Sequence, residues 1–332
     1  MGSIELEKPI NVASDNKVAF IVLSYNGSDD TIACLESLYA CKEKSADVIV
    51  IDNNSLPPVD ALLTSRFEDI ELISLPDNLG WAGGNNVGIE IALKRGYDWI
   101  CLLNNDTVFP DGQVKAWVET ICSLPPALVQ PSIYYWDEPE LAQLLEGYDK
   151  DGAKLPNVKE WHGNVVMNYA YGACLAIHRT IFEKIGSFDE RLFLQLEETD
   201  FYHRASREGY VSVCAPQVKI YHKESKAFGG KVTPSKTYYI IRNSLLLVEK
   251  HRGPVTDKLR LLRSLYWVLS KTAAREKRVQ SGAFGVFRWL LSGSPYAIAS
   301  RHGVADYIKR RFGRIPPSLA TRIIVSAPIV SA

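Results

Sequence analysis

The sequence predicts an α/β protein in which helices flank a mostly parallel sheet and a basic helical appendage follows. Short apolar runs alternate with helical stretches along about the first 110 residues, which is the rhythm of consecutive strand–helix–strand units. Each of these runs ends in a cluster of small polar residues. The charge is divided unequally, because residues 231–332 contain 19 Lys and Arg against 4 Asp and Glu, whereas residues 1–230 contain 19 against 34. This division separates an acidic body from a basic tail.

The first four predicted strands are short runs rich in apolar residues: Val18–Leu23, Val48–Ile51, Ile70–Leu75 and Trp99–Leu103. A continuous apolar run suits a strand buried on both faces, as in a parallel sheet covered by helices. Ser28 or Asp29 is expected to cap the helix after the first strand, and a later helix ends near Lys94. Strands joined by helices at this spacing imply right-handed crossovers and parallel pairing.

The rest of the chain gives a less regular pattern at first and then a helical one. The expected strands are Leu128–Tyr134, Tyr171–Ile177 and Val211–Ala215, the last followed by Ile220–His222. The expected helices are Thr180–Ile185, Glu197–Glu208 and, in the basic tail, stretches around Tyr238–Val248, Leu261–Leu269 and Phe284–Leu291. Gly209 is a natural end for the second of these helices.

Polar residues cluster at the carboxyl ends of three predicted strands, at Ser24–Asn26, Asp52–Ser55 and Asn104–Asp106. Parallel strands place these ends on one edge of the sheet, where open α/β sheets bind their ligands. A single carboxylate there, Asp106, would suffice to hold a divalent cation against substrate phosphates. The alternative is that Asn104–Asp106 only turns the chain before Pro110, as such residues do well.

The composition excludes a membrane-spanning chain and indicates a cytoplasmic protein. No run approaches the roughly 18 apolar residues of a membrane span. The N-terminus lacks the basic-then-apolar pattern of a secretory signal. The cysteines have no close pair at metal-ligand spacing and are expected to be buried free thiols: Cys34, Cys41, Cys101, Cys122, Cys174 and Cys214.

An ordered set of motifs resembles the family 2 inverting glycosyltransferases with the GT-A fold, particularly their rhamnosyltransferase-like branch. The motifs are Val18–Gly27, Val50–Asn53, Asp77–Asn86, Leu102–Thr107, Gly172–Cys174, Gly186–Glu190, Leu196–Asp200 and His222. Tyr238-Tyr239 and Arg242-Asn243 extend the resemblance loosely into the tail. It implies a Rossmann-like GT-A domain over 17–230. The polar residues 1–16 are expected to form a flexible N-terminus, and the basic residues 231–332 a helical region.

The resemblance implies a reaction and the residues that perform it. These enzymes transfer a sugar from a nucleotide diphosphate to a hydroxyl in one inverting displacement. Asp106 and His222 correspond to the family's metal ligands, for Mg²⁺ or Mn²⁺, although Asn104 stands where the family often has another aspartate. Glu198 falls at the catalytic-base position, where an aspartate is usual, and Glu197 or Asp200 are the alternatives. Acidic residues at a helix start also stabilise the helix dipole without any catalytic role.

The nucleotide sugar is expected to bind along the strand ends and the glycine-rich segment. The implied residues are Ser24, Tyr25, Asn26, Asp52, Asn54, Asn78, Gly80, Trp81, Gly84, Asn85, Asn104 and Asn105. Asp52 would accept a hydrogen bond from the pyrimidine, and a turn at Gly83-Gly84-Asn85 would let backbone approach the donor. Packing and helix capping are the alternative roles of this segment. The chain has no dinucleotide fingerprint and no phosphate loop of the Gly-x-x-x-x-Gly-Lys type.

The basic tail has three interpretations. Tyr266, Trp267, Phe284, Phe287 and Trp289 could enter an anionic membrane surface, bases could stack on the aromatic rings, or the tail could be an ordinary helical domain. A polyprenyl-diphosphate-linked acceptor, which the resemblance implies, favours peripheral contact with the inner face of the cell membrane. The first choice of donor is dTDP-L-rhamnose, for O-antigen-like polysaccharide assembly. Another dTDP- or UDP-sugar, a sugar-1-phosphate nucleotidyltransferase and a non-catalytic binding module are the alternatives.

Overall fold

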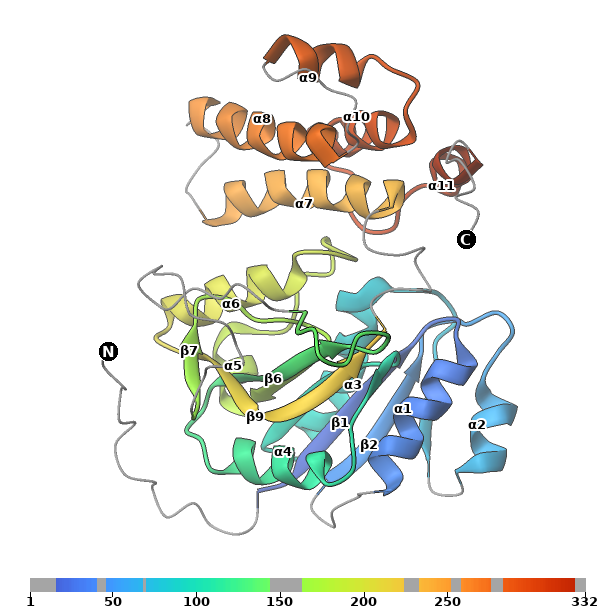
Figure 1. Ribbon diagram of the computed structural model, residues 1–332, viewed down its shortest axis with the longest axis vertical. Coiled ribbons are helices and arrows are strands. Elements are labelled where there is room, and N and C mark those ends of the chain that lie inside the picture. The colour runs from blue at the N-terminus through green and yellow to red at the C-terminus, as the bar shows by residue number, and fades with distance from the viewer. Residues whose placement is uncertain are drawn as a thin grey trace. The chain divides into compact units, whose positions relative to one another are not determined.

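The computed structural model describes residues 16–40, 46–67, 70–143, 163–223, 233–251, 258–275 and 283–325 (Figure 1). The chain divides into two compact units. The sheet unit comprises Met1–Asn78, Gly83–Phe188 and Phe201–Ala227, and the helical unit comprises Leu79–Ala82, Asp189–Asp200 and Phe228–Ala332. The predicted flexible N-terminus lies outside the described residues except for Asn16.

The sheet of the sheet unit has nine strands in the described part of the chain, in the order β3-β2-β1-β4-β8-β6-β9-β5, with β7 paired to β9. They are β1 Val18–Ser24, β2 Ala46–Asp52, β3 Glu71–Ser74, β4 Trp99–Asn104, β5 Thr107–Val108, β6 Leu128–Tyr135, β7 Val165–Met167, β8 Cys174–His178 and β9 Ser212–His222. The first four neighbours in this order are all parallel. In the other half, β6 and β9 are parallel, while β8, β5 and β7 pair antiparallel.

Helices cover both faces of the parallel half, which is why its strands read as continuous apolar runs. The helices that start or lie in this part of the chain are α1 Ser28–Ala40, α2 Asp60–Arg66, α3 Gly80–Lys94, α4 Gln113–Cys122, α5 Arg179–Ile185 and α6 Glu197–Arg207. Phe20 and Val22 share a core with Leu35 of α1 and Trp117 of α4. On the opposite face Ile21 lies so close to α3 that a Cβ on Gly88 would stand 2.4 Å from its Cγ2.

The predicted fold class is confirmed, and the structure changes two of the expected strands. The strand expected from Tyr171 begins at Cys174. The stretches Val211–Ala215 and Ile220–His222 form one strand, β9, whose pairing with β6 shifts register between Pro131 and Ser132. An irregularity of this kind interrupts the period-2 pattern, so one strand reads as two in the sequence.

The helical unit contains α7 Pro234–His251, α8 Lys258–Arg275, α9 Ala283–Leu290, α10 Pro295–Ile308 and α11 Pro317–Val325. Leu269, Val286, Trp289 and Ala297 belong to one of its cores. Trp289 is buried, which corrects the expectation that this ring faces a membrane. The other four aromatic side chains named for that role, those of Tyr266, Trp267, Phe284 and Phe287, are exposed. Among the described helices, none combines the length and apolar character that a membrane crossing requires.

The cysteines described by the structure are free thiols: Cys34, Cys101, Cys122, Cys174 and Cys214. Burial raises the pKa of the Cys34 thiol to about 12, which keeps it protonated and unreactive near neutral pH. Cys41 lies outside the described residues.

Candidate active site

The three polar clusters lie side by side at one edge of the sheet. Ser24 is in register with Asp52 on β2, and Leu23 is in register with Asn104 on β4. Because β1 is parallel to both neighbours, the turns that follow the three strands leave the sheet at the same edge. This is the ligand-binding edge of an open α/β sheet.

Hydrogen bonds join the turn after β1 to the turn after β2. The Asn26 backbone N–H donates to Ser55 Oγ at 3.0 Å, and Asn26 Oδ1 accepts from the Leu56 N–H at 2.7 Å. Asp52 is buried, and its Oδ1 accepts from the Ser55 N–H at 3.1 Å. Asn26 and Asn54 adopt left-handed backbone angles, with φ of 48° and 65°. The loop is therefore shaped by its own polar residues, as Asn and Asp permit.

The side chains at this edge differ in how they are placed. The Ser24 hydroxyl is fully buried and pairs with Thr31 Oγ1 at 2.9 Å. Tyr25 and Asn54 are half-buried. Asn105 Nδ2 donates to the same Thr31 Oγ1 at 2.9 Å, so α1 connects the ends of β1 and β4.

The glycine-rich segment is helix rather than turn. The expected turn at Gly83-Gly84-Asn85 is wrong, because α3 already begins at Gly80. A Cβ on Gly84 would stand 2.5 Å from Leu23 Cδ1, so this glycine lets α3 pack against β1. Just before the helix, Asn78 Oδ1 accepts from Asn53 Nδ2 at 3.1 Å and connects the segment to the turn after β2.

Gly80 and Trp81 belong to the helical unit. Gly80 has a φ of +75°, and a Cβ there would stand 2.3 Å from the Phe193 carbonyl oxygen. The Trp81 N–H donates to that oxygen at 2.7 Å. Only glycine fits at position 80, because both the backbone angle and the space exclude a side chain.

Asp106 is brought to His222 by the pairing of β5 with β9. Thr107 is directly opposite His222 in this antiparallel pair, and the Lys223 N–H donates to the Asp106 carbonyl oxygen at 3.0 Å. The Asp106 Oδ1 and His222 Nε2 atoms are consequently 3.2 Å apart. Both side chains are largely buried, with 15% of the Asp106 side chain and 5% of the His222 side chain exposed.

Gln143 orients the His222 ring. Its Nε2 donates to the His222 carbonyl oxygen at 2.8 Å, which leaves Oε1 facing His222 Nδ1, also at 2.8 Å. Nδ1 then carries a proton, and Nε2 faces the Asp106 carboxylate: in the neutral ring it presents a lone pair there, and in the protonated ring it donates to Asp106. No sequence pattern marks Gln143, because it lies in an irregular stretch 79 residues from the histidine.

The Asp106–His222 pair fits a divalent cation. In the neutral form of the ring, His222 Nε2 and the Asp106 carboxylate both offer lone pairs, so a cation between them would accept a bond from each. Ligands at right angles on an ion, each at about 2.1 Å, lie about 3 Å apart, close to the observed separation. Within the described residues no group of three or more His, Cys, Asp or Glu side chains is placed to hold a metal. Substrate phosphates and water would complete the coordination.

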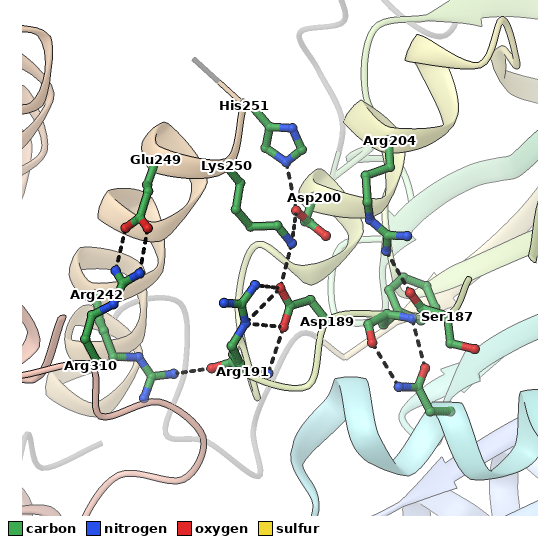
Figure 2. A network of polar contacts seen from close by, with 12 residues as sticks. Ser187, Asp189, Arg191, Asp200, Arg204, Arg242, Glu249, Lys250, His251 and Arg310 are labelled. Carbon is green, nitrogen blue, oxygen red and sulfur yellow. Dashed lines mark hydrogen bonds and ion pairs between the residues drawn. The ribbon is translucent and has the colours of Figure 1, made fainter. Parts of the chain in front are cut away.

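The predicted base lies in the first turn of α6, within the helical unit. Burial raises the pKa of Glu198 to about 7. Burial, and then the neighbouring Glu198, raise the pKa of Glu197 still further above its usual range. Asp200 Oδ1 instead lies 2.6 Å from Lys250 Nζ and 2.8 Å from His251 Nε2 (Figure 2). These surroundings favour Glu198 as the group that exchanges a proton near neutral pH, because Asp200 is engaged in ion pairs.

Comparisons with known proteins agree with this geometry. A model of glycosyl transferase family 2 matches residues 19–186. The N-acetylglucosaminyl-diphospho-decaprenol L-rhamnosyltransferase of Mycobacterium tuberculosis is 21% identical over 272 residues, which cover 70% of this chain and 84% of the relative. The dTDP-rhamnosyl transferase RfbF of Shigella flexneri is 23% identical over 257 residues, covering 74% and 84%.

Among solved structures, the mannosyltransferase PcManGT from Pyrobaculum calidifontis, in complex with GDP-Man and Mn²⁺, is similar with a TM-score of 0.52 and 16% identity. The match covers 97% of this chain and 90% of that one, and it confirms the GT-A fold. The family model spans half of the chain, including the three strand-end clusters and Asp106. The chain therefore belongs to glycosyl transferase family 2.

Proposed function

We propose that this glycosyltransferase moves L-rhamnose from dTDP-L-rhamnose, with inversion, to a hydroxyl of a lipid-linked saccharide during cell-surface polysaccharide assembly. The observation that carries the proposal is the Asp106–His222 pair, 3.2 Å apart in a family 2 chain and next to the strand ends. Two relatives, one named for an L-rhamnosyl transfer to a diphospho-decaprenol acceptor and one for dTDP-rhamnose, support the choice of donor and acceptor.

Each part of the site has a role in this proposal. The turns after β1 and β2, with Tyr25, Asn26, Asp52 and Asn54, hold the base and ribose of the donor. Asp106 and His222 hold a divalent cation, which would supply positive charge to the departing diphosphate. Asn104 and Asn105 flank this corner.

Glu198 takes the proton of the acceptor hydroxyl in the proposed reaction. The hydroxyl oxygen forms a bond to the anomeric carbon from the face opposite the diphosphate, and the bond to the diphosphate oxygen breaks. The displacement inverts the anomeric configuration. A base with a pKa near the working pH suits this proton transfer, and burial gives Glu198 such a pKa.

The test is to incubate the full-length protein with isotopically labelled nucleotide sugars and a polyprenyl-diphosphate-linked acceptor, with Mn²⁺, Mg²⁺ or a chelator. We expect transfer from dTDP-L-rhamnose that the chelator abolishes, and a rise in melting temperature with this donor plus Mn²⁺. Transfer from a different dTDP- or UDP-sugar would correct the donor. Stabilisation without transfer to any acceptor would favour a non-catalytic binding module. The family match gives no support to a nucleotidyltransferase.

Peripheral membrane contact is a further part of the proposal, and helices α8 and α9 support it. Their exposed apolar side chains include Leu262, Trp267, Phe284 and Phe287, with Trp267 63% and Phe284 78% exposed, and the exposed Leu291 directly follows α9. Neither helix contains an acidic residue, whereas Arg263, Lys271 and Arg288 are exposed on them. Apolar side chains among basic ones match the chemistry of an anionic lipid surface, and a lipid-linked acceptor would be met there.

A further inference from the structure

The segment that leads to Glu198 has an unusual backbone. Phe193, Gln195 and Leu196 have φ angles of 61°, 72° and 74°, in the left-handed region that non-glycine residues avoid. Three such residues within four positions do not form by local preference. Surrounding contacts must hold this segment in place.

The contacts come from two adjacent residues of α7, Arg242 and Asn243, which are both fully buried. Asn243 Nδ2 lies within hydrogen-bonding distance of three carbonyl oxygens, those of Leu192 at 2.8 Å, Leu194 at 2.9 Å and Gln195 at 2.8 Å. The two amide hydrogens of Asn243 are thus shared among three carbonyl groups of residues 192–195.

Arg242 extends the same contact toward the start of the segment. Its Nη2 donates to the Arg191 carbonyl oxygen at 3.1 Å (Figure 2) and to the Leu192 carbonyl oxygen, also at 3.1 Å. Its Nε donates to Asn243 Oδ1 at 3.0 Å, which fixes the orientation of the Asn243 amide. A buried guanidinium is stable here because carbonyl oxygens satisfy its donors.

The last turn of α7 holds both ends of the same segment. Lys250 Nζ lies 2.6 Å from Asp189 Oδ2 and 2.6 Å from Asp200 Oδ1, and His251 Nε2 lies 2.8 Å from that Asp200 oxygen. Burial opposes ionisation of Asp189, but hydrogen bonds from Arg191 and Lys250 outweigh it and lower the pKa of this carboxyl. Side chains of α7 therefore contact residues 189–200 at the beginning and the end (Figure 2), and Asn243 contacts the middle.

We propose that Arg242 and Asn243 are positioning residues that set the place and orientation of the catalytic base. Glu198 stands between the Gln195 carbonyl, which Asn243 holds, and Asp200, which Lys250 and His251 hold. The inference rests on the proposed function, because it takes Glu198 as the base. It gives the basic tail a role in the chemistry besides membrane contact.

The test compares Asn243→Ala with Tyr239→Phe in the full-length protein. The Tyr239 hydroxyl accepts from the Ile315 N–H at 2.8 Å, and the Tyr239 ring stacks on Phe193 with the ring centroids 5.5 Å apart. Tyr239→Phe removes this buried hydrogen bond from the same helix and keeps the ring that packs on Phe193. A displacement of the base by about 1 Å costs roughly 10²-fold in rate. We expect Asn243→Ala to lower kcat by about that factor, to shift the midpoint of the pH–rate profile, and to leave the donor KM and the donor-induced thermal shift unchanged. Tyr239→Phe should lower the melting temperature but leave the pH profile unchanged.

Lys250→Met loosens the end of the segment and carries the test if Asn243→Ala does not fold. It should lower kcat more than KM and shift the pH profile in the same direction. Equal kcat and pH profiles in the positioning variants and in Tyr239→Phe would overturn the inference while leaving the base assignment standing. Near-normal turnover in Glu198→Gln would overturn both.

Discussion

Two groups of acidic residues in this molecule have opposite surroundings. At the strand-end corner, the Asp106 carboxylate faces the Nε2 atom of a histidine that Gln143 holds by the other nitrogen. At the first turn of α6, the buried Glu197 and the half-buried Glu198 both have raised pKa values, and Asp200 beside them is paired with Lys250 and His251. The first arrangement suits a positive ion, and the second suits a proton.

This difference teaches that surroundings, and not residue type, assign roles to carboxylates. The two groups also differ in which interactions hold them in place. The corner follows from backbone pairing, since β5 and β9 place Asp106 and His222 together through their register. The α6 turn depends instead on side chains of α7, some 50 residues further along the chain.

Replacing one carboxylate at a time tests whether Asp106 binds a cation and Glu198 accepts a proton. We expect both Asp106→Asn and Glu198→Gln to lower the transfer rate by at least about 10²-fold, up to about 10⁴-fold for loss of a general base. Only Asp106→Asn should abolish the Mn²⁺-dependent thermal shift with the donor, because only this variant removes a cation ligand. Measured rates and melting temperatures check both points. If Asp106→Asn keeps metal-dependent activity, Asp106 is not a metal ligand, and Asn104–Asp106 serves only to turn the chain.

The pH dependence of activity and of stability tests the assignment of Glu198 as the base. A base must be deprotonated, so kcat/KM should rise with pH through about 7, the pKa of Glu198. The stability should change in the opposite sense, because a carboxyl whose pKa is raised on folding stabilises the fold at low pH and loses that contribution as pH rises through 7. Glu198→Gln should therefore melt a few °C, roughly 2–4 °C, above the native protein at pH 8, and at the same temperature near pH 4. The exposed Glu119→Gln is the control, and a lower melting temperature of Glu198→Gln at pH 8 would contradict the assignment.

The smallest effect on turnover is expected for the exposed aromatic residues of α8 and α9. Changing them separates the two proposed roles of the helical unit, membrane contact and positioning of the base. Trp267→Gln with Phe287→Gln should weaken sedimentation with anionic vesicles by about 10-fold or more, since each ring would lose burial in the interface. Transfer to a water-soluble acceptor should be unchanged. Leu62→Gln, which changes an exposed apolar residue of α2, is the control. A native protein that stays in the supernatant at low salt would remove the membrane proposal.

Much of the sheet unit could be predicted from the sequence because its signals are local. The apolar runs Val18–Leu23 and Val48–Ile51 mark strands within about two residues of the observed bounds. Parallel pairing then brings their polar ends to one edge. The turn predicted at Gly83-Gly84-Asn85 is wrong, because glycines before a helix and glycines within it look alike in sequence. The 2.5 Å approach of a Gly84 Cβ to Leu23 shows that α3 packs against β1 there.

Four features could be read from the sequence alone: the alternation of strands and helices over about the first 110 residues, the polar strand ends, the excess of basic residues after position 230 and the ordered motifs of the family. The side chains that support the functional ones could be identified only from the three-dimensional structure. Gln143 meets His222 across 79 residues, and Asn243 meets the Glu198 segment across about 50. Such contacts depend on strand register and helix packing between distant segments. They produce no periodic pattern in the sequence from which they could be predicted.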